Sequence, residues 1–318
     1  MPDIVVPAIP DSLKAGPVVL GHGDTVRTAA CTIIAAIHAH LAANLDAAID
    51  GRNPEGVHQV RVALRRFRVL AGLLRRDSPN VVLDGASGHA RTLAHGLNDA
   101  RNWDVFTITT LPGLGALAHV GVDAPGVLGP LAGPLRQGAA DTARAALGGT
   151  EARRFVYLLE QMIDGAVWIA PLPATVQQTL DEPAADFAAR HLTRLHRKAQ
   201  RQGRDLALLA PEERHQLRLT LKKLRYTAEF FQSLHAPGTG AAPYIRRLSR
   251  LQDVLGMDSD VLTTRALLAR IGETAPGPDI QYTLGAVAGF LCCRQAAMQD
   301  RTYARWRKFR RQSVFWHA

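Results

Sequence analysis

Hydrophobic residues recur at intervals of three and four positions along most of the chain, which is the pattern of amphipathic helices. In the first such segment, residues 24–49, Asp24 is expected to cap the helix. Its apolar positions follow helical spacing: Ile33, Ile34, Ile37, Leu41 and Leu45. In the next segment Asn53-Pro54-Glu55 has the form of a helix start, and Asp77-Ser78-Pro79 ends the helix after Arg76.

The rest of the chain predicts further helices and no strands. The expected helices are 88–100, 103–118 with a break near Pro112, 130–147, 151–169, 184–203, 211–234, 243–256, 259–271 and 280–311. A proline-rich stretch, 170–183, separates the two groups. No run alternates as a strand would, so the predicted fold class is all-α, with residues 1–17 as an extended N-terminal arm.

One basic motif occurs twice, about half the chain apart. The segment HQVRVALRRFR (His58 to Arg68) matches HQLRLTLKKLR (His215 to Arg225), and Leu97-Asn98-Asp99 matches Leu251-Gln252-Asp253. Asp104-Val105 likewise matches Asp260-Val261. The repeat predicts one domain, 18–317, made of two similar helical bundles, about 18–169 and 184–317, related by a pseudo-twofold axis.

The motif places its cations on one side of a helix. At about 100° per residue, His58, Arg61, Arg65 and Arg68 share an arc about 80° wide, beside an apolar arc that holds Val60, Leu64 and Phe67. We call these four residues the first stripe. The second stripe repeats the placement and comprises His215, Arg218, Lys222 and Arg225. Arg66 and Lys223 fall outside these arcs and are expected to face solvent, although both remain candidate contacts.

The stripes lack acidic neighbours in the sequence. No Asp or Glu occurs from Val57 to Arg76, and none occurs between Arg214 and Tyr226. Cations packed beside a core repel one another and lose hydration, so this pattern favours a site for an anion. The alternative is a charged face that distant acids neutralise.

The overall charge also favours an anionic partner. The chain has 38 Lys+Arg against 28 Asp+Glu, a net charge of +10. Arginine supplies most of the positive charge, and its guanidinium can hold phosphate oxygens through paired hydrogen bonds, although GC-rich codons would produce the same bias. Two other basic segments give additional candidate anion contacts, with an ordinary solvated helix as the alternative: Arg194, Lys198, Arg201, Arg301, Arg305 and Lys308.

Signatures of catalysis and of cofactors are missing from the sequence. It has no phosphate-binding loop, zinc-hydrolase pair, serine-hydrolase elbow or dinucleotide turn. His58 and His215 lack nearby carboxylates or cysteines to complete a metal site, so we expect no metal and no cofactor. Asp104 and the other repeated acids are expected to cap helices or to pair with basic residues, for instance Asp104 with Arg101.

Cysteine usage and hydropathy suggest a cytoplasmic protein without a membrane partner. Three cysteines make no disulfide framework, and no zinc-type Cys/His spacing surrounds them. The apolar run Leu284 to Cys293 is about half the length that a membrane-spanning helix needs.

The doubled motif resembles the CHAD family, the conserved histidine α-helical domain. The segments LNDARNWDV (Leu97 to Val105) and LQDVLG (Leu251 to Gly256) and the terminal Phe315-Trp316 resemble further elements of that family, over most of residues 18–317. The resemblance implies two helical bundles around a central basic channel that binds inorganic polyphosphate, often on polyphosphate granules. It also implies a pore lined by both stripes with Arg66 and Lys223. Asn102 stands where the family often has Asp, and no triphosphate-hydrolysing CYTH domain is visible.

Three functions follow for testing. The first is non-catalytic binding of inorganic polyphosphate, with granule-associated proteins as further partners. The second is nucleic-acid binding, which the arginines interleaved with Tyr303, Trp306 and Phe309 favour, although a chain with 6% aromatic residues has few platforms for base stacking. The third is a metal-dependent phosphohydrolase that uses a stripe histidine with the aspartates; the acids lie outside the stripes, which disfavours it.

Overall fold

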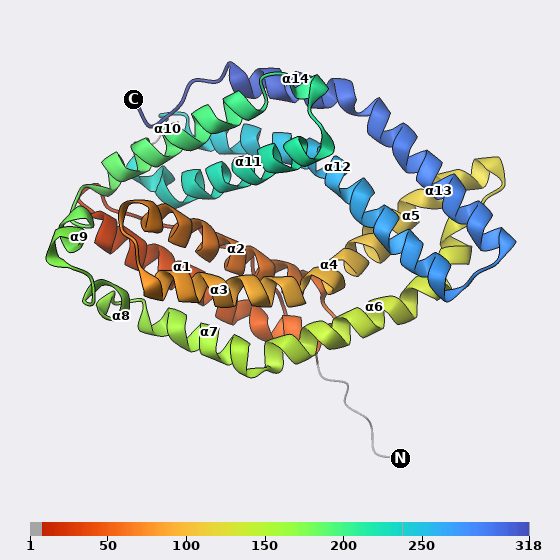
Figure 1. Cartoon of the computed structure of the whole chain (residues 1–318), viewed down its shortest axis with the longest axis horizontal. Helices are drawn as coiled ribbons and strands as arrows, with labels where there is room; N and C mark the ends of the chain where they lie inside the picture. The colour runs from red at the N-terminus through yellow and green to blue at the C-terminus, as the bar shows by residue number, and fades with distance from the viewer. Residues whose placement is uncertain (1–7, 237, 318) are drawn as a thin grey trace, which may run out of the picture. The chain divides into compact units, whose positions relative to one another are not determined.

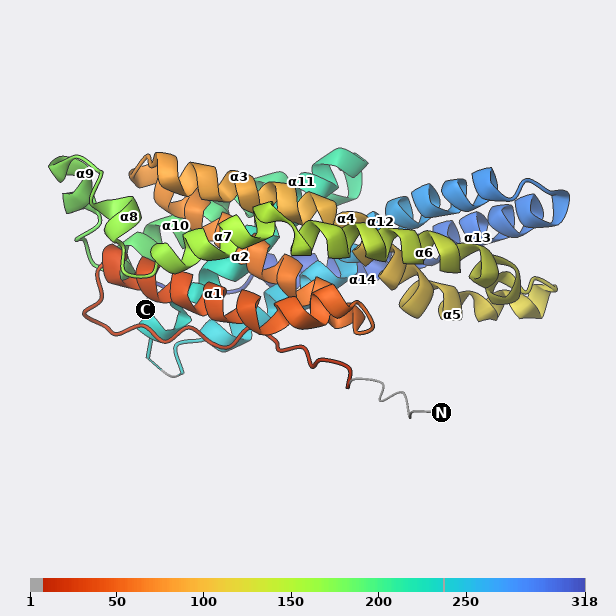
Figure 2. The same cartoon turned by 90° about the horizontal axis from the view of Figure 1, so that it is seen from below.

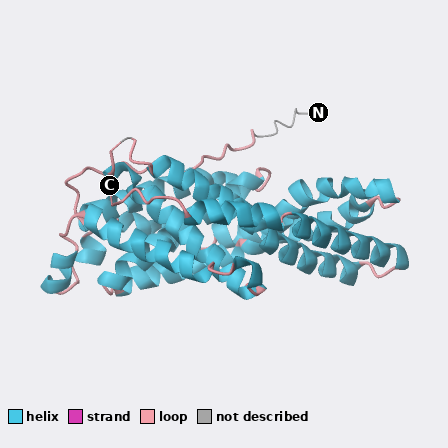
Figure 3. Ribbon diagram, turned by 90° about the horizontal axis from the view of Figure 1, so that it is seen from above, coloured by secondary structure: helices cyan, strands magenta, loops and turns pink. Residues whose placement is uncertain are grey.

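The computed structural model describes residues 8–236 and 238–317, and every regular element in these ranges is a helix (Figure 3). The predicted all-α class is therefore confirmed. The helices, in chain order, are α1 (Val26–Asp50), α2 (Pro54–Asp77), α3 (Val81–Gly96), α4 (Asn98–Val105), η1 (Phe106–Thr110), α5 (Leu111–Gly113), η2 (Leu114–Val120), α6 (Ala124–Gly148), α7 (Thr150–Gln161), α8 (Ala166–Ile169), α9 (Ala174–Thr179), α10 (Ala184–Gln202), η3 (Leu206–Leu208), α11 (Pro211–Phe231), η4 (Gln232–Leu234), α12 (Ala241–Thr274), α13 (Pro278–Ala297) and α14 (Gln299–Arg310) (Figure 1).

The chain forms two compact units. Unit 1 comprises Met1–Gly16, Ala30–Asp104 and Arg136–Gln177, and unit 2 comprises Pro17–Ala29, Val105–Leu135 and Gln178–Ala318. The first stripe belongs to unit 1 and the second to unit 2. The limits of the two repeats, their symmetry and a channel between them stay predictions.

Part of the predicted N-terminal arm, residues 1–7, lies outside the described residues. Residues 8–17 form neither helix nor strand. Within unit 1, Asn44 of α1 holds this segment, because its side chain accepts a hydrogen bond from the Leu13 N–H and donates one to the Leu13 carbonyl, both at 2.9 Å.

Capping explains where the first two helices begin. α2 begins at Pro54, where the helix start was predicted, and Asn53 caps it, since its side chain accepts from the Glu55 N–H at 3.0 Å. The predicted cap of α1 was wrong: the Asp24 carboxylate accepts from the Gly21 N–H at 2.8 Å, and the Thr25 hydroxyl accepts from the Thr28 N–H at 3.3 Å.

Two helices, α3 and α6, begin earlier than predicted. Asn80 accepts from the N–H groups of Val82 and Leu83, so α3 starts at Val81 despite the glycines that follow. α6 starts at Ala124, six residues before the predicted start at Pro130, and continues through Pro130 and Pro134.

Pro112 disturbs the chain as predicted. Proline lacks an N–H and clashes with the carbonyl four residues before it, and here the α-helical pattern gives way to the π-helical η1 and then to the 3₁₀ helix η2.

The C-terminal helices differ from the prediction in their breaks. The expected interruption between 256 and 259 is absent, and α12 runs unbroken over 34 residues. The expected single helix 280–311 is instead two, α13 and α14, separated at Met298. Within unit 2, α12 and α13 lie side by side (Figure 2).

The core of unit 1 forms where α1 and α2 approach closely. A Cβ atom on Gly56 would lie 2.5 Å from backbone atoms of α1, so only glycine fits this crossing. Phe67 of α2 packs edge-on against Phe155 of α7, with ring centroids 5.4 Å apart. By length and composition α1 could also cross a membrane, but its apolar residues Ile33, Ile34 and Ile37 are fully buried in the core.

The core of unit 2 joins α10, α11, α12 and α14. Tyr244 of α12 is fully buried and contacts Phe309, Phe315 and Trp316, while its hydroxyl shares a 2.8 Å hydrogen bond with His196 Nδ1 of α10. The terminal Phe315-Trp316 pair therefore closes this core.

Candidate anion-binding site

The first stripe lies along one face of α2. The apolar arc beside it is fully buried, with Val60, Leu64 and Phe67 at most 1% exposed. His58, Arg61 and Arg65 are half-buried and Arg68 is exposed, so the stripe follows the edge of the core as the helical wheel predicts.

Arg61 is held in place by the next two helices. Its Nη1 donates to the Ala94 carbonyl of α3 at 2.8 Å and to the Asn98 side-chain oxygen of α4. Asn98 belongs to the repeated Leu97-Asn98-Asp99 motif, so this motif positions a stripe residue. Its neighbour Leu97 is fully buried and anchors the junction of α3 and α4.

Burial and then mutual repulsion among cations shape the electrostatics of this face. Burial and then the charge of Arg101 lower the pKa of His58 to about 4, with further lowering by Arg65 and Arg61 and an opposing effect of Glu55. The pKa of Arg61 falls to about 10 because of burial and the charges of Arg65 and Arg101.

The same effect reaches the end of the stripe. Burial, then Arg91 and Arg65, lower the pKa of Arg68. A bound anion would relieve this repulsion, so the face has the electrostatics of an anion site.

Sequence reasoning did not include Arg91 and Arg101 in the site. Arg91 lies on α3 and Arg101 on α4, and their charges act on the first stripe. Finding these two arginines from the sequence would have required the correct boundaries of both helices. The Asp104 carboxylate accepts a hydrogen bond from Arg136 Nε of α6 at 2.8 Å, and the charge of Arg101, its suggested partner, also acts on it. Burial raises the pKa of Asp104, and Arg136 opposes that rise.

Arg66 does not face solvent as the helical wheel predicted. It is only 3% exposed, and its charge contributes to a lowered pKa of His40 in α1, for which burial is the main cause. α1 covers the side of α2 that the wheel left open. Arg66 thus belongs to the α1–α2 interface, and its burial makes it a poor contact for a large anion.

The second stripe, on α11, has its exposed residue at the opposite end from that of the first. His215 is exposed, whereas Arg218, Lys222 and Arg225 are half-buried. Lys223 is exposed, as the wheel predicted.

An acid just beyond the motif sets this stripe apart. Arg225 pairs with Glu229 one turn later, at 3.3 Å, and lies over the Tyr226 ring at 4.8 Å. The second stripe is therefore partly neutralised at its C-terminal end.

The LQDVLG segment of α12 packs against the second stripe. Gln252 Nε2 donates to the buried Leu221 carbonyl at 2.8 Å. A Cβ on Gly256 would lie 3.5 Å from a guanidinium nitrogen of Arg218, an ordinary van der Waals distance, so this part of α12 packs closely on the Arg218 side chain. The matching motifs of the two halves thus both contact a stripe helix, although Asn98 binds an arginine side chain and Gln252 a backbone carbonyl.

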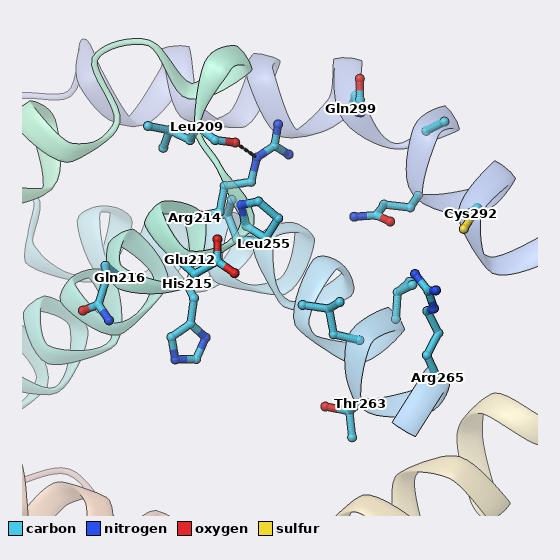
Figure 4. Close-up of a pocket in the computed structure, with 15 residues that line it drawn as sticks. Leu209, Glu212, Arg214, His215, Gln216, Leu255, Thr263, Arg265, Cys292 and Gln299 are labelled. Carbon is cyan, nitrogen blue, oxygen red and sulfur yellow. Dashed lines mark hydrogen bonds between the residues drawn. The ribbon is translucent and has the colours of Figure 1, made fainter. Parts of the chain in front are cut away.

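A cavity of about 720 Å³ opens beside His215 (Figure 4). Arg214, Glu212 and Arg265 line it together with apolar residues of α12 and α13. Among the residues that the structure describes, no group of three His, Cys, Asp or Glu is placed to hold a metal ion.

The six additional anion contacts suggested by the sequence lie at two other sites in unit 2, one on α10 and one on α14. Arg194 and Arg201 of α10 line a cavity of about 760 Å³ with Arg190 and Arg197, and Lys198 is exposed on the same helix. Arg305 and Lys308 of α14 line a cavity of about 480 Å³, and Arg301 is exposed one turn before them. Neither cavity includes a residue of the stripes.

Comparison with known proteins agrees with the fold and the motifs. The family model of the CHAD domain matches residues 32–269. The crystal structure of the CHAD domain from the plant Ricinus communis superposes with a TM-score of 0.79 at 24% sequence identity, covering 95% of this chain and 98% of that one. PptA from Streptomyces chartreusis gives a TM-score of 0.66 at 18% identity, covering 89% and 99%. No curated protein matches the sequence.

Proposed function

Because the chain belongs to the CHAD family, whose known role is polyphosphate binding, we propose that it binds inorganic polyphosphate on the basic faces of α2 and α11. The observation that carries the proposal is the cation cluster of unit 1. The pKa of each of His58, Arg61 and Arg68 is lowered by burial and then by neighbouring positive charges. The phosphate units of the ligand would neutralise these charges.

Binding follows from the chemistry of the two partners. Polyphosphate has closely spaced charges and no bases, so guanidinium groups in a row can hold successive units through charge-assisted hydrogen bonds. Release of counterions adds to the affinity and makes it fall with salt concentration. The proposed contacts are His58, Arg61, Arg65, Arg68, Arg91 and Arg101 in unit 1 and His215, Arg218, Lys222 and Arg225 in unit 2.

The positions of the aromatic residues favour polyphosphate over nucleic acid. Trp306 and Phe309, which supported nucleic-acid binding in the sequence, are 3% and 1% exposed and belong to the core of unit 2. The remaining tryptophans, Trp103, Trp168 and Trp316, are also buried. Grooves for single strands use exposed aromatic rings to stack bases, and these tryptophans offer none.

A pair of double variants tests the proposed site. Arg65→Gln with Arg68→Gln removes two charges from the first stripe and leaves the hydrogen bonds of Arg61 in place. We expect at least about a tenfold weaker affinity for long-chain polyphosphate, since a hydrogen bond to a charged group contributes about 1.5–3 kcal/mol. The matched control, Arg153→Gln with Arg154→Gln on exposed positions of α7, removes the same charge from the same unit. Equal losses in both variants would show that only net charge matters, which would refute the site.

Competition separates the two ligand classes. Labelled polyphosphate is bound at physiological salt, and unlabelled duplex DNA, single-stranded RNA or polyphosphate is added at equal phosphate concentration. The proposal expects displacement by polyphosphate alone; equal displacement by nucleic acid would favour the second function. In the same solutions, steady release of phosphate with divalent metals present would overturn binding without hydrolysis.

The proposal extends to the place of the protein in the cell. A polyphosphate binder in the cytoplasm would collect on polyphosphate granules, as the family resemblance implies. A fluorescent fusion should label granules, and the Arg65→Gln, Arg68→Gln variant should spread through the cell. Granule labelling that survives this change would instead point to a partner protein on the granule surface.

A further inference from the structure

Helix α14 is fixed to unit 2 by its buried face. A Cβ on Gly203, after α10, would lie 2.2 Å from the Trp306 ring, so this ring packs directly on the backbone there. Phe309, three residues later, contacts Tyr244 of α12 and His196 of α10. The outer face of α14 is therefore held in a defined position beside α12.

Two rows of cations face a common cavity between these helices. Arg305 and Lys308 of α14 and Arg311 at its C-cap are spaced three residues apart, as are Arg247 and Arg250 on α12. Together they line the cavity of about 480 Å³, and all five of its lining residues are positively charged. We call these five residues the α12–α14 groove. Asp253, one turn after Arg250, is exposed and does not line it.

We propose that the α12–α14 groove is a second phosphate-binding site, which takes a short linear phosphate chain. Five cations around one cavity repel one another, so the ligand must carry several negative charges in a small volume. Four of the five are arginines, whose planar forks suit phosphate oxygens. Of the aromatic rings of α14, Trp306 and Phe309 are buried in the core and Tyr303 is half-buried, and none of them lines the cavity.

This site goes beyond the proposed function because it shares no residue with the stripes. A protein that binds polyphosphate at the stripes and also at the α12–α14 groove would hold two polyphosphate molecules, or two segments of one molecule, at the same time. The protein would then bind long polyphosphate more tightly than short polyphosphate, because a molecule bound at one site has a raised effective concentration at the other.

Lysine footprinting on the full chain tests the groove directly. Lys308 is its one lysine, and Lys222 lies in the second stripe; both are compared with Lys14, which is outside both sites. The protein is acetylated briefly with and without tripolyphosphate, and the rate at each lysine is read by mass spectrometry. We expect Lys308 to be modified at least about fivefold more slowly with ligand, while Lys14 is unchanged.

The outcomes separate this proposal from the proposed function. Protection of Lys222 without protection of Lys308 would overturn the groove and leave the stripes standing. Protection of Lys308 alone would support the groove and count against the second stripe. Protection of Lys308 by duplex DNA at equal phosphate concentration would overturn the assignment to a linear phosphate chain.

Matched double variants supply an independent readout. Arg305→Gln with Lys308→Gln changes the groove, whereas Arg307→Gln with Arg310→Gln removes equal charge from exposed positions of the same helix that do not line it. Titration calorimetry with tripolyphosphate should show one class of sites lost, or weakened at least about tenfold, in the first variant only. Equal losses in both variants would refute the groove.

Discussion

The ionisation of His58 gives the sharpest test of the first stripe. Burial and the charges of Arg101, Arg65 and Arg61 lower its pKa from 6.5 to about 4, which is about 300-fold weaker proton binding than by a free imidazole. At pH 7 about one molecule in a thousand then carries a proton on this ring. The prediction is a neutral histidine inside a cluster of cations.

Two variants should move this pKa in opposite directions. Arg101→Gln removes the strongest neighbouring charge, so the pKa of His58 should rise, although it stays below 6.5 because burial remains the largest cause. Glu55→Gln removes an acid that favours the charged ring, so the pKa should fall below about 4. The pair distinguishes a charge effect from a general change of structure, which would not reverse sign.

The assay is an NMR titration of the His58 ring proton, assigned from its disappearance in His58→Gln. Polyphosphate brings negative charge to the ring, so its pKa should rise on binding, and binding should take up protons. Affinity should accordingly increase as the pH is lowered from 6.5 towards the free-state value of about 4. A free-state pKa at or above 6.5, or the same pKa in both variants, would refute the cluster.

Three further predictions concern stability. Gly56→Ala places a Cβ 2.5 Å from the backbone of α1 and should lower the free energy of unfolding by about 1–3 kcal/mol in urea denaturation. Gly203→Ala, which collides with the Trp306 ring at 2.2 Å, should cost a similar amount and alter the near-ultraviolet circular dichroism; unchanged spectra would contradict this packing. Burial lowers the pKa of His196 to about 4, so the unfolded chain binds its proton first, and stability should fall as the pH drops from 6.5 to 4; His196→Gln should flatten that slope.

The fold class and the stripe helices were predictable because their signals are local. Helical periodicity and the Asn53 cap are contained in neighbouring residues, and the structure has α2 where they place it. Helix breaks were less predictable. A break was predicted after Gly256, between the helices 243–256 and 259–271, but Gly256 is buried inside a continuous helix that packs against Arg218 of α11. Such a position depends on a neighbouring helix that the local sequence does not show.

In the candidate site too, features within one helix were predictable and features of packing between helices were not. The wheel of α2 predicted which cations share a face, because helix geometry alone decides that. It could not show that α1 covers Arg66, nor that Arg91 and Arg101 bring their charges to the stripe from other helices. These are properties of packing between segments, and a single helical wheel holds no information about them.

The hydrogen bonds of Arg61 to Ala94 and Asn98 bear on how ligand length affects binding. These hydrogen bonds order the Arg61 side chain during folding. The conformational entropy lost when polyphosphate binds is therefore mainly that of the flexible ligand. All units of a linear phosphate polymer are alike. A rigid row of hydrogen-bond donors can therefore bind the polymer in many equivalent registers. The number of these registers grows with the length of the polymer. Long polyphosphate therefore binds with higher affinity for statistical reasons, without any new contact.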